Sequence, residues 1–300
     1  MSSSGIYVET SIAASLDEVW RLTQEPGLHA PWDLRFTTID YLPRSANEAQ
    51  KFLYTTRIGF GLEIAGKGES VGTRESDTER TSALRFSSGS QLSLIREGSG
   101  YWKYVLRRND VLFFTWYDYE VRWGPVGFLI DQAIFRPLIG WATAWSFDRL
   151  RLWAERGTRP ELTLALTLVY SISRLAIVTI WLWHGLVPKL LYPQGEEIAL
   201  LAAQHLSPAF LPWAGWAEVA MAVLGIAAWR WRGYFVFTAV LMMAALVGVS
   251  LTAPGYLAHA FNPVTLNLGV MALCATGFLS TPYAAFAGRC ARRGKGLKGA

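Results

Sequence analysis

The sequence predicts two domains of different class. Residues 1–160 are expected to form an α+β domain, an antiparallel sheet with a long C-terminal helix, and residues 161–300 an all-α bundle of four transmembrane helices. The first half carries 19 basic and 19 acidic side chains and the second 9 and 4, so the net charge of +5 belongs to the apolar half. The second half also holds four apolar runs of about 20 residues, the length of a membrane-crossing helix. Nucleic-acid binding is not predicted, because it needs a folded basic face.

The first domain begins with a strand and a helix. In "IYVETSI", residues 6–12, side chains alternate with the period of two that a half-buried strand requires. Ser15 and Glu18 have the spacing of a capping box, and Pro26 ends the helix that follows. Short apolar segments separated by turn residues such as "GSG" and "RND" then predict an antiparallel meander. Its strands are expected at residues 35–42, 51–59, 62–72, 81–88, 93–97, 101–108 and 111–123.

A long helix over residues 125–155 is expected to close this domain. Pro125 suits its first turn, and Pro137 predicts a kink near its middle. Apolar side chains recur every three or four residues and form a stripe that could lie across a sheet. The stripe contains Phe128, Phe135, Leu138, Ala142, Trp145 and Leu152.

The opening segment "IYVETSIAASLDEVWRLTQEPGLHAPWD", residues 6–33, resembles the START-like (SRPBCC, polyketide cyclase) family. The resemblance covers residues 5–155 and implies a helix-grip fold, in which a sheet curves around a cavity for a hydrophobic ligand. It implies no particular reaction, because members range from lipid carriers to cyclases.

Five aromatic residues are candidates for lining such a cavity: Trp32, Phe113, Tyr117, Tyr119 and Trp145. The same pattern would arise from a plain sheet core, and this alternative stays open for each residue. Asp33, beside Trp32, can be a structural corner or a catalytic carboxylate. No nucleophile motif, phosphate loop or metal-binding helix is found, so the sequence predicts no catalytic site in this domain.

The four apolar runs of the second domain lie at about residues 168–187, 212–229, 233–251 and 263–281. Basic residues flank the first span, join the second to the third and follow the fourth, whereas the segment between the third and fourth spans has none. Since Lys-rich and Arg-rich loops stay cytoplasmic, both termini are expected in the cytoplasm and the spans in the inner membrane. The N-terminal segment lacks the pattern of a cleaved signal peptide.

Three polar side chains are expected in one layer near the outer boundary: His184, Glu218 and Asn267, at depths of about 5 to 9 Å. A carboxylate in hydrocarbon is costly, so Glu218 is either a functional residue or interhelical glue. Arg174, nearer the other side, is expected to snorkel to the headgroups.

The segments "WLWHGLVPKLLYPQGEE", residues 181–197, and "GWAEVAMAVLG", residues 215–225, resemble the DoxX-like family. Within that pattern the matching positions are His184, Gly185, Pro188, Lys189, Glu197 and Glu218. Some members are associated with quinone-linked redox systems. Here Cys274 and Cys290 form no pair for thiol chemistry, and haem ligation by His184, His205 and His259 is disfavoured because two of them lie in loops.

The sequence therefore predicts a membrane-tethered domain that binds a hydrophobic small molecule or lipid, with no cofactor and no metal. The alternative is a subunit of a quinone-linked membrane oxidoreductase, with Glu218 and His184 handling protons. The polar layer expected in the membrane consists of His184, Lys189, Glu197, Glu218 and Asn267.

Overall fold

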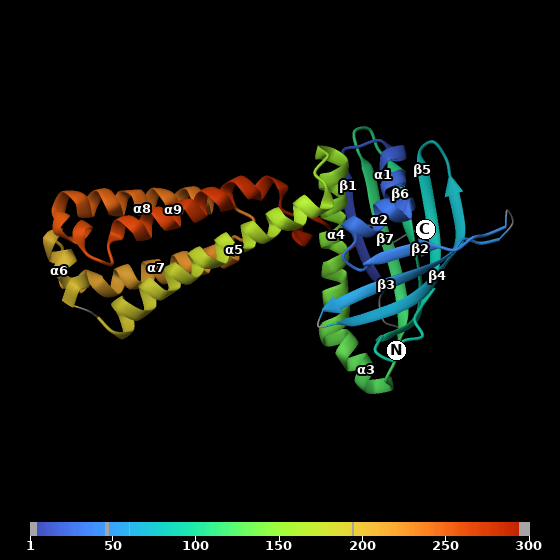
Figure 1. Cartoon of the computed structure of the whole chain (residues 1–300), viewed down its shortest axis with the longest axis horizontal. Helices are drawn as coiled ribbons and strands as arrows, with labels where there is room; N and C mark the ends of the chain where they lie inside the picture. Colours follow the sequence, from blue (N-terminus) through green and yellow to red (C-terminus); the bar gives the residue numbers. More distant parts are fainter. Residues whose placement is uncertain (1–4, 46–47, 60, 194, 294–300) are drawn as a thin grey trace. The chain divides into compact units, whose positions relative to one another are not determined.

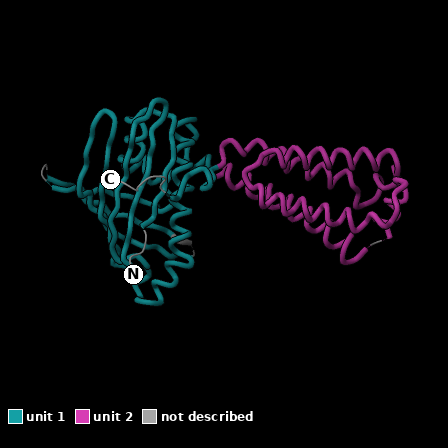
Figure 2. Tube along the Cα trace, turned by 180° about the vertical axis from the view of Figure 1, so that it is seen from behind, with its two compact units in different colours: residues 1–163, 285–300 teal, residues 164–284 magenta. Residues whose placement is uncertain are grey.

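The structure, a computed structural model, describes residues 5–45, 48–59, 61–193 and 195–293. The chain forms two compact units, residues 1–163 with 285–300 and residues 164–284 (Figure 2). The segment after the last long helix, assigned to the second domain in the sequence analysis, thus lies with the N-terminal unit.

The N-terminal unit is a seven-stranded antiparallel sheet in the order β1-β7-β6-β5-β4-β3-β2 (Figure 1). Helices α1 (Leu16–Gln24) and α2 (Pro26–Trp32) connect β1 to β2. As expected, the Ser15 hydroxyl caps α1 by accepting from the N–H of Glu18 at 3.2 Å. The strands are β1 (Ile6–Ile12), β2 (Thr38–Tyr41), β3 (Lys51–Gly59), β4 (Leu62–Glu75), β5 (Glu79–Ser87), β6 (Ile95–Leu106) and β7 (Val111–Val121).

Strand β6 corrects one expectation. The sequence "GSG", residues 98–100, was taken as a turn between two strands, but it lies inside β6 and pairs with β5 and β7. Gly98 is required there because a Cβ would lie 2.6 Å from Cζ of Phe86 on β5. The glycine therefore makes room for a neighbouring ring.

The closing helix is interrupted. Helix α3 (Gly124–Ile130) passes through a π-helical turn, η1 (Asp131–Phe135), into α4 (Arg136–Arg156). Pro137 lies in the first turn of α4, so the irregularity falls just before it. The wide turn shifts the helical register, and Leu138, expected on the packed stripe, is 57% exposed. Trp145 and Leu152 are buried as expected, and Phe135 packs against the core.

The core of this unit lies between the sheet and α4. The rings of Phe113 on β7 and Phe147 on α4 stack with centroids 4.4 Å apart. Residues after the last long helix complete the unit, since Cys290 and Ala287 belong to the core and Ala291 forms an antiparallel bridge with Glu9 on β1. An antiparallel sheet wrapped on a long C-terminal helix is the helix-grip fold that the sequence predicted.

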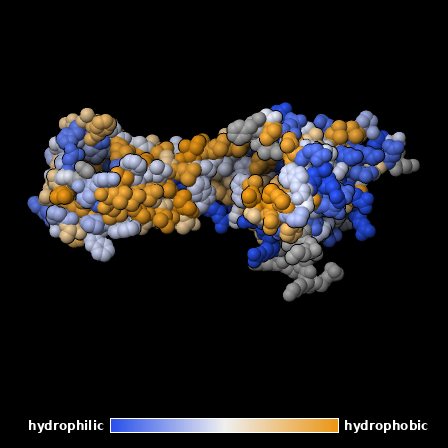
Figure 3. Space-filling model, turned by 90° about the horizontal axis from the view of Figure 1, so that it is seen from below, coloured by the Kyte–Doolittle hydropathy of each residue, from blue (hydrophilic) through white to orange (hydrophobic). Residues whose placement is uncertain are grey.

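The second unit is helical. Four of its helical stretches are long and apolar enough to cross a membrane: Pro160–Leu191, Pro208–Ala227, Gly233–Thr252 and Pro263–Tyr283. At most 33% of each apolar window is buried, so most of its surface is available to lipid (Figure 3). These stretches contain α5 (Pro160–Gly185), η2 (Leu186–Leu191), η3 (Pro208–Phe210), α7 (Leu211–Ala227), α8 (Gly233–Thr252), α9 (Pro263–Ser280) and η5 (Thr281–Tyr283). The connections include α6 (Gly195–Ala203) and η4 (Pro254–Ala258), and η6 (Ala287–Arg289) follows in the first unit.

Candidate functional site

The inner face of the sheet, the face that packs toward α4, carries aromatic rings that lie over glycines. In one row across the strands, Phe52 pairs with Gly68 and Phe86 with Gly98. The rings of Phe52 and Phe86 occupy the space that a side chain at the paired glycine would take. Phe52 and Phe86 are half-buried. This row therefore offers a flat apolar surface that is not fully covered.

Two further glycines flank this row, Gly66 on one side and Gly100 on the other. The Tyr54 ring lies over Gly66, and Tyr117 lies against Gly100. The ring of Phe36 meets that of Tyr54 edge-on, with centroids 5.4 Å apart. We call the rings of Phe36, Phe52, Tyr54, Phe86 and Tyr117 the aromatic floor.

A buried charged cluster borders the aromatic floor. The Asp33 carboxylate accepts from Nε and Nη2 of Arg35 at 2.9 and 2.6 Å and pairs with Nε2 of His29 at 3.0 Å. The Asp33 side chain is 0% exposed, whereas those of His29 and Arg35 are each 13% exposed. The Arg35 guanidinium lies 5.6 Å from the centroid of the Tyr117 ring. His29 and Arg35 therefore lie at the edge of the aromatic floor, and both bind the buried carboxylate of Asp33.

The charge state of this cluster follows from its surroundings. Burial alone would raise the pKa of the Asp33 carboxyl, but Arg35 and His29 outweigh it and hold that pKa well below its usual range. Burial lowers the pKa of the His29 imidazole despite Asp33. At neutral pH the cluster therefore contains a carboxylate, a guanidinium and a neutral imidazole.

The five aromatic residues proposed from the sequence are all buried, at 6% exposure or less. Tyr117 belongs to the aromatic floor. Phe113 and Trp32 both contact Phe147. Tyr119 donates to Asp131 at 2.6 Å, and the Trp145 indole N–H donates to the carbonyl of Ala285 at 3.1 Å.

Sequence reasoning missed most of the floor, namely Phe36, Phe52, Tyr54 and Phe86, and the partners of Asp33. A signal was present: "AGKG" and "GSG" place glycines two residues apart within strands, opposite aromatic residues on the neighbouring strand. Such glycines mark the close approach of another group.

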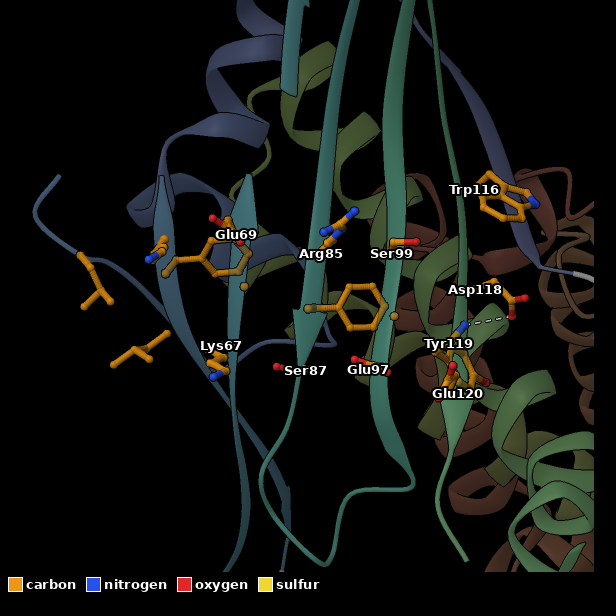
Figure 4. A pocket seen from close by; sticks show the side chains of 17 residues that line it. Lys67, Glu69, Arg85, Ser87, Glu97, Ser99, Trp116, Asp118, Tyr119 and Glu120 are labelled. Carbon is orange, nitrogen blue, oxygen red and sulfur yellow. Dashed lines mark hydrogen bonds between the residues drawn. The ribbon is translucent and has the colours of Figure 1, made fainter. Parts of the chain in front are cut away.

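The other face of the sheet differs sharply in chemistry. A groove of about 880 Å³ crosses strands β3 to β7 (Figure 4). The charged residues Lys67, Glu69, Arg85, Glu97 and Glu120 line it, and so do Phe52, Phe86 and Tyr119, with which they alternate along the strands. A groove with charges of both signs is a poorer site for an apolar ligand than the aromatic floor.

A second polar cluster lies in the helical unit. Lys189, in η2, is 9% exposed, and its ammonium lies 3.2 Å from Glu218 on α7 and 3.4 Å from Glu197 on α6. The ammonium also lies 3.5 Å from the carbonyl oxygen of His184. Glu218, the single carboxylate of an apolar helix, is thus engaged by a lysine.

Two glycines bring these helices together. A Cβ on Gly185 would lie 2.6 Å from the carbonyl oxygen of Gly215 and 2.9 Å from Cβ of Glu218. Close packing of small residues is a common way to join membrane helices. The contact sets Lys189 within reach of Glu218.

The three polar side chains expected in one outer layer, His184, Glu218 and Asn267, do not form one cluster. Asn267 on α9 donates to the carbonyl of Met242 on α8 at 3.2 Å and so joins a different pair of helices. His184 contributes its main-chain oxygen to the lysine cluster. The cluster accordingly unites Lys189, Glu197 and Glu218.

Arg174 corrects a further expectation. It does not snorkel but is fully buried, and it donates to the carbonyls of Gly225, Ala228 and Trp231 at 2.8, 2.5 and 3.0 Å. Gly225 lies in the last turn of α7, where helix carbonyls lack an intrahelical partner, and Ala228 and Trp231 lie in the connection to α8. A guanidinium has enough donors in one plane to satisfy all three.

Fold and composition define the class: a membrane protein in which a helix-grip domain and a four-helix membrane unit share one chain. The DoxX-like family matches residues 178–275, which lie in the helical unit.

The chain belongs to the family of the membrane protein YndG of Bacillus subtilis (strain 168), which is described as uncharacterized. The two sequences are 48% identical over 187 residues, which are 62% of this chain and 70% of the relative.

Two solved structures are similar to the N-terminal unit. The di-domain aromatase/cyclase StfQ of the steffimycin biosynthetic pathway is 14% identical, with a TM-score of 0.39, over 50% of each chain. The Zhui aromatase/cyclase from Streptomyces sp. R1128 is 12% identical, with a TM-score of 0.36, over 50% of this chain and 98% of its own. The fold assignment rests on the strand order and closing helix of the chain itself.

Proposed function

We propose that the N-terminal unit binds a hydrophobic small molecule or lipid on the aromatic floor, and that the helical unit holds this binding domain at a membrane. The observation that carries the proposal is the set of rings that lie over glycines of neighbouring strands, half-buried at Phe52 and Phe86. Flat rings beside a few fixed polar groups are typical of sites for apolar ligands. His29 and Arg35 would orient a polar end of the ligand.

Neighbouring residues on β5 provide the test. Phe86 and Arg85 both line the groove, but as neighbours on a strand their side chains project to opposite faces of the sheet, and only Phe86 lies over Gly98 in the aromatic floor. Binding of a fluorescent long-chain fatty acid to the full-length protein would be measured for Phe86→Ala and for Arg85→Ala. Loss of a buried ring is worth about 1.5 to 3 kcal/mol, so Phe86→Ala should weaken binding about 10-fold to 100-fold.

Arg85→Ala is expected to bind as the unmodified protein does. No saturable binding by the unmodified protein, or equal weakening by the two substitutions, would contradict the proposal. The unmodified protein and both variants should also have the same unfolding midpoint within a few degrees, so that a folding defect is not mistaken for lost binding.

The membrane cluster supports a second candidate, a quinone-linked redox subunit. Two carboxylates, Glu197 and Glu218, share the single ammonium of Lys189, and this excess of acid favours a site that exchanges a proton. Glu218→Gln separates the two roles of the glutamate. A proton-handling role predicts normal assembly with lost quinone-dependent turnover, whereas a structural role predicts a less stable helical unit.

We further propose that both termini are cytoplasmic. Four candidate spans return the chain to its starting side, and the segment after the fourth packs with the N-terminal unit. The basic flanks give the direction.

A further inference from the structure

The outer surface of α3, η1 and the first part of α4, up to Trp141, lacks charge. From Trp123 to Trp141, the exposed residues are Trp123, Gly124, Pro125, Val126, Leu129, Ile130, Gln132, Ala133, Ile134, Pro137, Leu138 and Trp141. Gln132 is the only one of these with a polar side chain, and the exposures of Leu129 and Ile134 reach 67% and 64%. We call this surface the apolar ridge. Such a contiguous patch on a soluble domain marks an interaction site.

The ridge is a consequence of helix register. Gly127 and Asp131 are buried on the opposite side, and Phe135 and Ile139 pack against the core. Asp131 is held there by Tyr119 and by Nε of Arg136 at 2.8 Å. The charged groups of this segment, Asp131 and Arg136, are therefore held on the inner side, whereas most of its aliphatic side chains point outward.

Helix α4, which carries the end of the ridge, also contacts both points at which the chain leaves the N-terminal unit for the helical one. Trp141, at the end of the ridge, stacks on Trp145 with centroids 6.2 Å apart. Trp145 in turn donates to Ala285, the first residue of this unit after the last span. At the other connection, Arg149 on α4 donates to the carbonyl of Pro160, where α5 begins.

The segments that connect the two units are short, and this restricts what can cover the ridge. Only Gly157–Arg159 separate α4 from α5, which continues into the first candidate span. The N-terminal unit is thus permanently close to a bilayer. Tryptophan at both ends of an otherwise aliphatic surface suits the boundary between headgroups and hydrocarbon.

We propose that the apolar ridge lies in the interfacial layer of the membrane that the chain's own helices cross. The partner is a lipid surface, not a second protein. This contact does not depend on whether the aromatic floor binds a ligand. It would attach the N-terminal unit to the membrane non-covalently, in addition to the two chain connections to the helical unit.

Single cysteines would test this in the full-length protein. Ile134→Cys and Leu138→Cys place a nitroxide spin label on the ridge, and Leu53→Cys places one on the outer face of the sheet, where Leu53 is 47% exposed. The native Cys274 and Cys290 are buried, and the unsubstituted protein gives the background labelling. Accessibility to oxygen and to a water-soluble nickel chelate would be measured in vesicles of phosphatidylcholine and phosphatidylglycerol.

Labels at residues 134 and 138 should be severalfold more accessible to oxygen than to the chelate, and the label at residue 53 should show the reverse. Preferential access of the chelate at 134 and 138 would show that the ridge faces water and would overturn the proposal. Protection from both reagents would also overturn it, and dipolar broadening between labels would then identify a second copy of the chain as the occupant.

Discussion

The buried carboxylate of Asp148 accepts a hydrogen bond from the main-chain N–H of Phe286, 138 residues further along the chain, at 2.8 Å. The same carboxylate binds Arg151 at 2.8 Å and Arg289 at 3.1 Å. Asp148 precedes the first candidate span and Phe286 follows the last. The helical unit is therefore an insertion within the N-terminal unit, which is assembled from both ends of the chain.

Asp148→Ala should release the segment around Phe286. A hydrogen bond to a buried charge contributes about 1.5 to 3 kcal/mol, so the loss of the bonds to Phe286 and Arg289, the two partners in the C-terminal segment, should alone lower the free energy of unfolding by about 3 kcal/mol. Cys290 reports the release, because burial raises the pKa of its thiol to about 12 while its Sγ contacts the carbonyl of Ala144. In a Cys274→Ala background, a maleimide at pH 8 should label Cys290 much faster in Asp148→Ala. Asp77→Ala, at an exposed hairpin, is the control and should leave the rate unchanged.

The C-terminal segment should be needed for the N-terminal unit to fold stably. Residues 1–163 joined by a flexible linker to residues 285–300 should unfold cooperatively in urea. Residues 1–163 alone should unfold at lower urea, because Trp145 and the edge of β1 are then uncovered. Equal midpoints for the two proteins would show that the segment is an accessory and not part of the fold.

Arg174 should be the main polar stabiliser of the contact between α5 and α7. Arg174→Met leaves three carbonyls without their donor and should cost about 3 kcal/mol. Arg174→Lys should recover only part of this, since an ammonium lacks the planar fork. Thermal unfolding in detergent measures the difference. Leu175→Met is the control, because Leu175 is 48% exposed and should change little.

Lys189 and Glu218 should be energetically coupled. Lys189→Met leaves Glu218 without its cation and should destabilise the helical unit more than the double substitution Lys189→Met, Glu218→Gln does. A double-mutant cycle on thermal stability gives the coupling energy, expected at about 1 to 2 kcal/mol. Strictly additive effects would mean that the 3.2 Å ion pair contributes nothing.

The cluster at Asp33 should make the N-terminal unit sensitive to acid. Burial lowers the pKa of His29, so the unfolded chain gains a proton near pH 6.5 that the folded chain does not. The free energy of unfolding should therefore fall as pH drops below about 6.5. The depressed pKa of Asp33 adds stability above about pH 4 that is lost as pH falls further.

Urea unfolding between pH 5 and 8 would test the histidine part. His29→Gln should flatten the slope, and His205→Gln, which changes an exposed loop residue, should preserve it. A slope that persists in His29→Gln would assign the pH dependence to another group.

The sequence predicted both architectures because each follows from a local period: alternation at residues 6–12, the capping pair Ser15 and Glu18, and four long apolar runs. Composition and length were enough to identify these elements.

Long-range pairing was not predictable in this way. Gly98 reads as a turn residue until Phe86 on the next strand is seen to lie over it. Likewise, "RCARRGKGLK" reads as a basic flank, and nothing local shows that Arg289 binds Asp148. Arg174 lies near a membrane boundary in sequence, but the carbonyls of Gly225, Ala228 and Trp231, at and after the end of α7, hold it inside. Each failure concerns a residue whose partner is distant in sequence.

Whether the N-terminal unit carries a hydrophobic ligand can be measured without knowing what the ligand is. The most direct measurement is native mass spectrometry of the full-length protein, gently extracted from its membrane, beside the Phe86→Ala variant. If the ligand binds on the aromatic floor, we expect a reproducible added mass of lipid or small-molecule size on the unmodified protein. This mass should be released as one species and should be lost in Phe86→Ala. An unmodified protein with no added mass would contradict this expectation. An added mass that is retained by Phe86→Ala and lost in Glu218→Gln would also contradict it, and would place the site in the membrane.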